Sequence, residues 1–387
     1  MALTTTEVRT CAELKYELED HSSDSPTFNS RMTCRIMNDL DFNEEGFWYH
    51  PDSIFLDMAL NRNYMGNAGS QRNYIIDGGR YEEDPVTHAQ VLVGNNALTN
   101  IYTYPNSVVL RPTGMSNNYC NGITIKNLDF EAVLNQSVLF NGSSGWGPVI
   151  FENCNFNLKI VGYPKLAING QQTAAIFYYS CAGSSGSVNS GHLRFVNCTF
   201  NIEIVGSPER KFMGLMTGSG NLAYAGISAS VVVDACEFRI KNMTNDCGFC
   251  IYGNTATFAP ASGSGDPTSV YINNCAHFLN NYLYEVNANN CFYLECNKPS
   301  TNRTTIMNSF VAAFADTADG TIDPAYRSKL ICKSDFATGF FYDSDRIVHE
   351  FASGNSEMGN PHIALTTAEC KSESKLREIG FLFATES

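Results

Sequence analysis

Six segments between residues 123 and 310 repeat one pattern of hydrophobic and polar positions. A run of β-branched or aromatic residues is followed in most of them by Asn, then a small residue or Cys, and then Phe. The segments are ITIKNLDF (123–130), VIFENCNF (149–156), LRFVNCTF (193–200), VVVDACEF (231–238), VYINNCAHF (270–278) and TTIMNSF (304–310). Their closing phenylalanines are separated by 26 to 44 residues. Self-similarity on this scale indicates a solenoid, and the variable spacing indicates a constant unit that carries loops of different length.

Alternation within VIFENCNFNLKI (149–160) predicts which side chains enter the core. Successive side chains of a strand point to opposite faces, so Phe151 is expected inward and Glu152 outward. Asn153 is expected in a tight turn between two strands, because Asn tolerates the left-handed backbone that such a turn requires. After the turn, the expected inward positions are Cys154, Phe156, Leu158 and Ile160.

Stacking of these segments on successive coils predicts two columns of matching side chains. The first is a ladder of amide hydrogen bonds between the turn residues Asn127, Asn153, Asn197 and Asn274. The second is an internal stack of aromatic rings, which begins with Phe130, Phe156, Phe200 and Phe238 and continues to Phe278 and Phe310. The fourth segment departs from the pattern, because Asp234 and Ala235 stand where Asn is expected.

The pattern therefore predicts an all-β chain folded as a right-handed, single-stranded parallel β-helix with three strands in each coil. Helical periodicity is nearly absent between residues 100 and 340, which argues against a helical solenoid. We expect an N-terminal cap at 1–45, the β-helix at 46–345 and a C-terminal segment at 346–387.

The N-terminal segment EVRTCAELKYELED (7–20) has helical signals. Thr10 and Glu13 have the spacing of a capping box, and Leu14 and Leu18 lie four residues apart on one face. We expect this helix to shield the first coil of the β-helix from solvent and from edge pairing.

Three other segments define the ends of the solenoid. CRIMNDLDF (34–42) is expected to follow the helix as part of the cap, and NYIIDGGRY (73–81) predicts an early strand and a turn. Near the C-terminus, LTTAECKSESKLREIGF (365–381) predicts a short helix that begins at a Thr cap and ends at Gly380.

Charge and hydropathy limit the partners. The formal net charge is −14 and the basic residues are scattered singly, so no nucleic-acid partner is expected. No stretch reaches the 18 or so apolar residues of a membrane span. The first residues, MALTTTEVRT, have neither a basic region nor an apolar stretch, so we expect no secretory signal. We therefore expect the protein to be made in a host cytoplasm.

The fourteen cysteines are expected to be reduced. Cys154, Cys198, Cys236 and Cys275 recur at one position of the repeat, where they serve as small buried hydrophobic side chains. Cys247 and Cys250 form a single CxxC without a second pair or nearby histidines, which favours two inward thiols over a zinc site. The sequence predicts no metal site and no cofactor.

The repeated segments resemble the pectate-lyase-like superfamily of parallel β-helices, and are most similar to the tailspikes, tail fibres and other virion proteins of bacteriophages. The helical cap and the Asn-bearing repeats carry this resemblance. It implies a virion location, a homotrimer, and contacts with other virion proteins and with a host surface polysaccharide.

Many β-helices act on carbohydrates, and glycoside hydrolysis needs two carboxylates at a defined separation. The outward-facing candidates are Glu152, Glu203 and Glu237, with Asp129. The alternative, which we favour, is that they form the polar solvent face of the strands. The clustered aspartates of polygalacturonases and the calcium-binding acids of pectate lyases have no match, so no active site is indicated.

Two classes of function remain. The first is a virion structural or adhesive protein for host attachment, in which Tyr178, Tyr179, Tyr282 and Tyr284 are candidates for stacking on glycans; core packing is the alternative role for these tyrosines. The second class is a polysaccharide depolymerase. A capsid-decorating protein without catalytic activity is a further alternative to both.

Overall fold

The structure is a computed structural model. It describes residues 4–19, 31–43, 54–59, 73–105, 107–113, 122–145, 148–162, 166–168, 171–173, 175–181, 193–205, 212–219, 223–224, 227–228, 231–242, 248–253, 270–281, 292–295, 304–314, 336–345 and 362–381.

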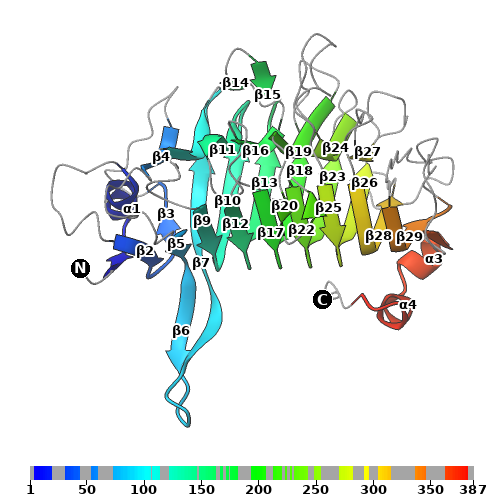
Figure 1. Cartoon of the computed structure of the whole chain (residues 1–387), viewed down its shortest axis with the longest axis horizontal. Coiled ribbons are helices and arrows are strands. Elements are labelled where there is room, and N and C mark those ends of the chain that lie inside the picture. The colour runs from blue at the N-terminus through cyan, green and yellow to red at the C-terminus, as the bar shows by residue number, and fades with distance from the viewer. Residues whose placement is uncertain are drawn as a thin grey trace.

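The chain forms a parallel β-helix in which the strands of successive coils stack into rows (Figure 1). Two rows belong to one 19-stranded sheet, and a third row forms a separate 7-stranded sheet. In the central coils the first row contains β9 (Gly122–Lys126), β12 (Val149–Glu152), β17 (Leu193–Val196), β22 (Val231–Asp234) and β25 (Val270–Asn273). The second row contains β10 (Leu128–Leu134), β13 (Asn155–Ile160), β18 (Thr199–Ile204), β23 (Glu237–Asn242) and β26 (Ala276–Asn281).

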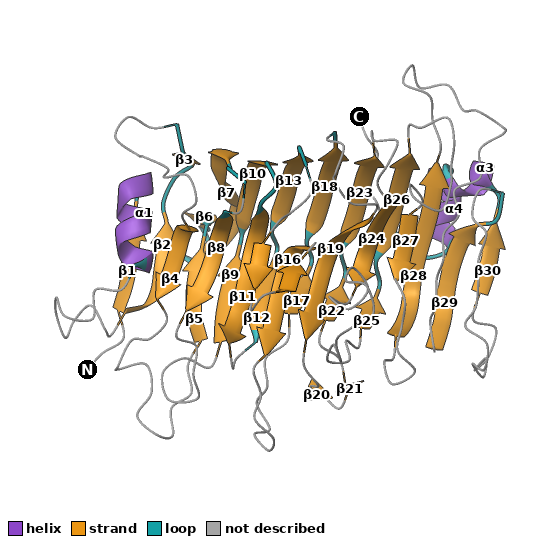
Figure 2. Cartoon of the chain, turned by 90° about the horizontal axis from the view of Figure 1, so that it is seen from above, coloured by secondary structure: helices purple, strands orange, loops and turns teal. Residues whose placement is uncertain are grey.

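The third row lies across the core from the first two (Figure 2). It contains β4 (Ile54–Ala59), β8 (Val108–Thr113), β11 (Val138–Gly145), β16 (Ala175–Cys181), β19 (Phe212–Ser219), β24 (Gly248–Gly253) and β27 (Phe292–Glu295). Two small antiparallel pairs lie outside the rows, β14 (Leu166–Ile168) with β15 (Gln171–Thr173) and β20 (Ala223–Tyr224) with β21 (Ile227–Ser228). The predicted fold class is therefore confirmed.

The terminal coils extend the same sheet. At the N-terminal end lie β1 (Thr4–Val8), β2 (Arg31–Ile36), β3 (Leu40–Asp41), β5 (Asn73–Asp77) and β7 (Gln90–Tyr102). At the C-terminal end lie β28 (Thr304–Phe314), β29 (Phe336–Asp343) and β30 (His362–Leu365). Among the described residues, β30 pairs with β29 alone, so β30 is the last strand of the sheet that the structure describes.

The turn between the first and second rows holds a residue with left-handed backbone in consecutive coils. The residues and their φ values are Asn127 (54°), Asn153 (54°), Asn197 (51°), Ala235 (53°), Asn274 (52°) and Asn308 (46°). Asn adopts this conformation more readily than other L-residues because its short side chain can hydrogen-bond locally. The repeated Asn is therefore explained by the turn itself, and Ala235 occupies the same strained backbone without that advantage.

Side-chain amides at these turns form a ladder over the first coils. Asn153 Nδ2 donates to Asn127 Oδ1 at 2.8 Å, and Asn197 Nδ2 donates to Asn153 Oδ1 at 3.1 Å. At Ala235 the ladder stops. A second ladder, one position earlier in the strand, joins Asn273 Nδ2 to Asp234 Oδ1 at 2.9 Å. The ladder bond that the sequence predicted for Asn274 is therefore made by its neighbour Asn273, because Asp234 supplies the acceptor that Ala235 lacks.

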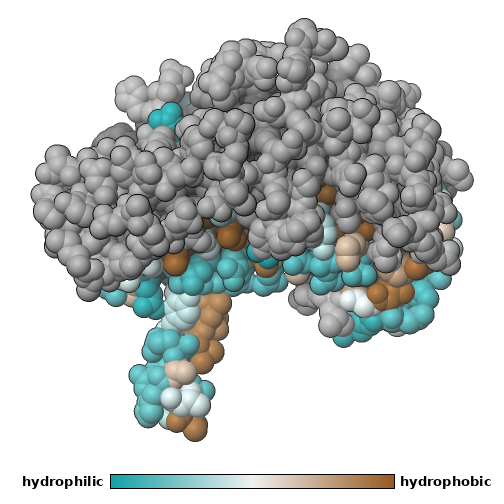
Figure 3. All heavy atoms as spheres, in the orientation of Figure 1, coloured by the Kyte–Doolittle hydropathy of each residue, from teal (hydrophilic) through white to brown (hydrophobic). Residues whose placement is uncertain are grey.

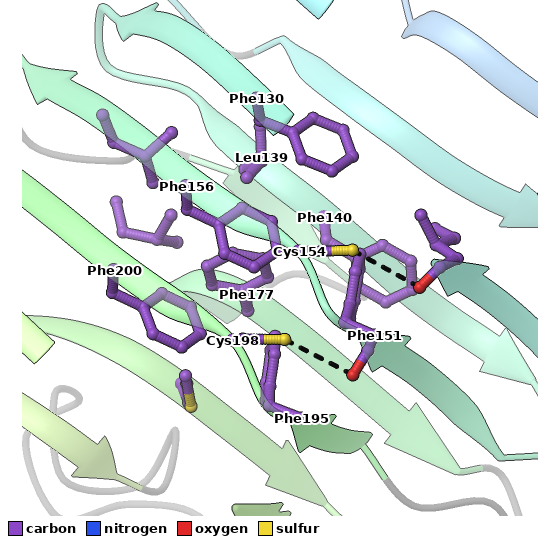
Figure 4. Close-up of a cluster of buried hydrophobic side chains, with 14 of the residues drawn as sticks. Phe130, Leu139, Phe140, Phe151, Cys154, Phe156, Phe177, Phe195, Cys198 and Phe200 are labelled. Carbon is purple, nitrogen blue, oxygen red and sulfur yellow. Dashed lines mark hydrogen bonds between the residues drawn. The ribbon is translucent and has the colours of Figure 1, made fainter. Parts of the chain in front are cut away.

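The aromatic stack fills the core as the repeat alignment predicted (Figure 4). It ends earlier than predicted, because Phe238 is its last phenylalanine. Phe130, Phe156, Phe200 and Phe238 are fully buried and lie in register on adjacent strands. Their stacked ring centroids are 5.2, 4.9 and 4.6 Å apart in that order. A second stack on the first row, Phe151 with Phe195 at 5.1 Å, meets the first one edge-on.

The expected positions of Phe278 and Phe310 are wrong. Phe238 is in register with His277, whose ring continues the stack at 4.8 Å, so Phe278 points to the outer face. Phe310 pairs with Ala276 and also lies on that face. The fifth segment has one residue more between its Asn and its Phe than the earlier segments, and the sixth has one residue fewer. These shifts move Phe278 and Phe310 to the opposite face.

The repeat cysteines line the core beside the turns as thiols. Cys154 Sγ donates to Ile125 O and Cys198 Sγ donates to Phe151 O, both at 3.5 Å (Figure 4). All cysteines whose side chains the structure describes are buried and free: Cys11, Cys34, Cys154, Cys198, Cys236, Cys275 and Cys370. The CxxC of residues 247–250 lies outside the described side chains.

Helix α1 (Cys11–Leu18) covers the N-terminal end of the core, as the sequence predicted. Leu14 and Leu18 are buried and belong to the same hydrophobic cluster as the coils. Thr10 Oγ1 accepts from the backbone N of Glu13 at 3.1 Å. The Glu13 carboxylate bonds the backbone N of Arg9 instead of Thr10, so the capping box is incomplete.

A two-stranded arm projects from the first coils (Figure 1). It consists of β6 (Gly79–Glu83), which pairs antiparallel with the first half of β7, and the turn between them. The sequence predicted a strand and a turn at 73–81 but not this arm. Val86, Val91, Leu92 and Val93 of the arm are exposed. One side of the arm is brown, that is hydrophobic, in Figure 3.

The C-terminal segment forms two short helices where the sequence predicted one. They are α3 (Thr367–Cys370), which has a complete capping box between Thr366 and Glu369, and α4 (Glu373–Glu378). Ser372 caps α4 and so interrupts the predicted single helix, and Gly380 ends it with a φ of 93°.

These helices pack on the outer face of the last strands. Phe381 contacts Phe310 and Phe341, with ring centroids 5.8 and 5.9 Å apart. A second hydrophobic cluster, the C-terminal lobe, forms there from Ala276, Phe310, Ala312, Leu365, Cys370, Leu376 and Phe381.

Candidate functional site: a polar groove on the second row of strands

A groove with a volume of about 830 Å³ follows the outer face of the second row. It crosses β7, β10, β13, β18, β23 and β26 one after another. Five strand spacings of about 4.8 Å make it roughly 24 Å long. Its outward-facing residues are Asn100, Tyr102, Glu131, Val133, Asn157, Lys159, Asn201, Glu203, Arg239, Lys241 and Phe278.

The floor of the groove follows the pleat of the strands. Alternation that buries Phe156, Phe200 and Phe238 turns the next residue of each strand outward, and these are Asn157, Asn201 and Arg239. Asn201 Nδ2 donates to Asn157 Oδ1 at 2.9 Å, which fixes the orientation of both amides. The groove therefore presents amide and guanidinium groups at the strand spacing.

A second line of groove residues alternates in charge. Lys159, Glu203 and Lys241 are directly in register on three adjacent strands. Opposite charges that face each other across strands stabilise a sheet by roughly 0.2–1 kcal/mol per pair. Glu203 is thus flanked by a lysine on each side.

Aromatic side chains lie at the two ends of the groove. Tyr102, at the end of β7, is 54% exposed. At the other end the guanidinium of Arg239 lies over the ring of Phe278, 5.1 Å from its centroid. Both side chains present apolar surface next to hydrogen-bonding groups.

The carboxylates proposed from the sequence are not brought together as a pair. Glu203 and Glu237 are on adjacent strands but four residues apart in register, which separates their backbones by about 14 Å. The two carboxyl groups of a glycosidase are roughly 5–9.5 Å apart. Glu237 also forms an ion pair with Arg239.

Glu237 and the other two acidic candidates lie outside the groove lining. Glu152 ends β12 in the first row, where it is in register with Lys126. Asp129 Oδ1 accepts hydrogen bonds from Asn95 at 2.8 Å and from Asn155 at 2.7 Å, so it ties the arm to the second row.

The tyrosine candidates for glycan stacking remain predictions. Tyr178 and Tyr179 are on β16 in the third row, but their side chains lie outside the described residues. Tyr282 and Tyr284 also lie outside the described residues.

Titratable and metal-binding groups give no second chemical centre in the described part of the chain. No three His, Cys, Asp or Glu side chains there are grouped so as to hold a metal ion. His277 is buried, and burial lowers its pKa to about 4, so the ring is neutral. Its Nδ1 lies 3.0 Å from Phe310 O.

Sequence reasoning missed most of the groove. It chose acidic side chains and looked for pairs. Of these acids only Glu203 lines the groove, whose other charged and amide groups are Glu131, asparagines, lysines and Arg239. The signal was present in the alternation: the residues after each stacked Phe, at 157 and 159, 201 and 203, and 239 and 241, are all polar. Tyr102 gave no such signal, because β7 lies outside the repeated segments.

None of the helices in the described ranges has the length and apolar character needed to cross a membrane.

Comparison with known proteins gave no match: no protein-family model, no curated protein and no solved structure is significantly similar to the chain.

Proposed function

We propose that the protein is a non-catalytic adhesin that binds an extended polysaccharide along the polar groove, as part of a bacteriophage tailspike, tail fibre or other virion appendage. The observation that carries the binding role is the groove, a straight row of hydrogen-bonding side chains with aromatic side chains at both ends.

The regular spacing of the groove suits a polymer. Each strand adds an equivalent outward position about 4.8 Å further along the axis. A ligand built of repeating units can therefore make similar contacts several times, and several weak contacts add up to useful affinity.

The chemistry of the groove suits a carbohydrate. Fixed amides such as Asn157 and Asn201 donate and accept hydrogen bonds, which matches hydroxyl groups that also do both. Tyr102 offers an apolar ring with a polar tip, on which the C–H face of a sugar can lie.

Binding is favoured over cleavage by the placement of the acids. The backbones of Glu203 and Glu237 are about 14 Å apart, whereas the carboxyl groups of a glycosidase are roughly 5–9.5 Å apart, and Glu237 is engaged by Arg239. The depolymerase alternative therefore requires acids other than this pair.

The virion location rests on the resemblance of the repeats to phage β-helices and on the rigidity of a stacked parallel sheet. A homotrimer would present three parallel grooves and raise the avidity for a host surface polysaccharide. Light scattering of the purified protein tests the trimer, and immunolabelling of phage particles tests the location.

Binding and cleavage can be measured in one experiment. The full chain is incubated with a panel of immobilised bacterial surface polysaccharides, and bound protein and released reducing ends are both determined. We expect saturable binding to some polysaccharides without release of reducing ends. Tyr102→Ala should weaken binding about three- to tenfold.

The control is Tyr16→Ala, which removes an equally exposed tyrosine from the cap helix, far from the groove, and should leave binding unchanged. Reducing ends that disappear in Glu203→Gln or Glu152→Gln would favour the depolymerase. If the protein binds none of the polysaccharides and immunolabelling finds it on capsids, the capsid-decorating alternative would be favoured.

A further inference from the structure

A second pocket lies at the base of the arm, and none of its lining residues belongs to the polar groove. It has a volume of about 520 Å³ and is formed between the arm and β2. We call it the arm-base pocket; its lining residues are Arg35, Met37, Gly79, Arg80, Tyr81, Glu82 and Val93.

Two guanidinium groups line this pocket, and neither has an anionic partner among the described residues. Of the arginines whose side chains the structure describes, Arg9, Arg239 and Arg377 form ion pairs with glutamates. Arg35 lies over the ring of Tyr81, 4.9 Å from its centroid. Within the described residues, neither Arg35 nor Arg80 is ion-paired or hydrogen-bonded through its guanidinium.

The nearest buried carboxylate is already neutralised. Asp77 accepts hydrogen bonds from Tyr81 Oη at 2.9 Å, from Asn127 Nδ2 at 2.9 Å and from the backbone N of Gly79 at 2.9 Å. Lys126 Nζ lies 3.3 Å from Asp77 Oδ2. Asp77 therefore holds the arm on the first row and leaves the arginines uncompensated.

The same contacts hold the pocket in shape. Burial and the neighbouring Asp77 raise the pKa of Tyr81 to about 12, so the phenol stays protonated and donates to Asp77. Arg80 packs over Gly94, whose missing side chain leaves room for the guanidinium: an added Cβ would lie 3.3 Å from Arg80 Nη2. Both arginines are thus placed before a ligand arrives.

The lining carries a local charge of +1, from two arginines and Glu82, in a chain whose net charge is −14. Two planar guanidinium forks match the oxygens of a carboxylate. Met37 and Val93 add apolar walls, which a bare inorganic ion cannot use but the C–H faces of a sugar ring can.

We propose that the arm-base pocket binds the carboxylate of an acidic sugar residue, such as a uronic acid. The choice of a sugar as the bearer of the carboxylate rests on the proposed function. The site itself is separate from the polar groove, so a host polysaccharide with acidic residues would be held at two places.

Ligand-observed NMR tests the site with the full chain and three probes: sodium glucuronate, glucose and inorganic phosphate. We expect saturable binding of glucuronate, weaker in higher salt, and none of glucose. Arg35→Gln and Arg80→Gln should each weaken glucuronate binding at least about tenfold. Arg377→Gln removes the same charge from α4 and should have no effect.

Three outcomes would overturn the proposal. Glucose that binds as well as glucuronate would show that the carboxylate is not recognised. Phosphate that binds at least as tightly would show a general anion site. An equal loss in Arg377→Gln would show that only net charge matters. Tyr102→Ala should leave glucuronate binding intact, so a failure of this site and a failure of the groove are distinguishable.

Discussion

The central and the last coils share one backbone repeat but bury different faces. From β10 to β23 the second row has a hydrophobic inner face and a polar outer face, and the outer face forms the groove. In β26 and β28 the outward positions Ala276 and Phe310 are also buried, because α3, α4 and Phe381 cover them. The turn fixes the register in both regions, and the distant C-terminal segment decides whether the outer face meets solvent.

The largest effect should come from the aromatic stack of the central coils. Phe200→Ala removes a fully buried ring between two stacked neighbours and should lower the free energy of unfolding by roughly 3–5 kcal/mol. Phe278→Ala, at the next position of the sequence repeat but on the outer face, should cost about 1 kcal/mol. Urea unfolding of both variants measures the difference; equal losses would contradict the assigned register.

At the end of the stack, His277 makes stability depend on pH. Its pKa is about 4 in the folded chain and near 6.5 when unfolded, so the unfolded chain binds the proton more tightly. Stability is therefore full above pH 6.5 and falls by roughly 3 kcal/mol as the pH drops from 6.5 to 4. Between these pH values, the midpoint temperature of thermal unfolding should depend less on pH in His277→Phe than in the unaltered chain.

The unaltered chain, unfolded over the same pH values, is the reference for this slope. A His277→Phe variant with an unchanged slope would show that His277 is not buried as a neutral ring.

A smaller effect should come from the break in the amide ladder. Ala235 has a φ of 53° without a side chain that favours it, so Ala235→Asn should stabilise the chain by about 1 kcal/mol. Asn153→Ala, in the intact part of the ladder, should destabilise it by about 1–2 kcal/mol, since two amide hydrogen bonds are lost. The midpoints of urea unfolding should shift in opposite directions; a destabilised Ala235→Asn would contradict the role of the turn.

Local sequence signals predicted the fold well where the structure depends on local chemistry. Alternation and the turn residue placed Phe156, Phe200 and Phe238 in the core and Asn153 at the turn. The signal failed where the spacing after the turn changes. Phe278 lies four residues after Asn274 and Phe310 lies two residues after Asn308, instead of three, and this puts both on the outer face.

The candidate site was less predictable for a related reason. A groove of amides and lysines has no motif, and its residues become a site only when strands from separate coils lie side by side. The arm-base pocket combines Arg35 with Arg80, which are distant in sequence and meet only because the arm leaves the first row beside β2. Neither spacing nor composition indicates such a meeting.

Hydroxyl-radical footprinting of the protein with and without a bound polysaccharide tests the groove most directly. Tyr102 and Phe278 lie at opposite ends of the groove and should react without the polysaccharide. We expect both to be protected when it binds, while Val86 at the tip of the arm reacts equally in both states. A bound polysaccharide that leaves Tyr102 and Phe278 as reactive as before would contradict the groove as the binding site.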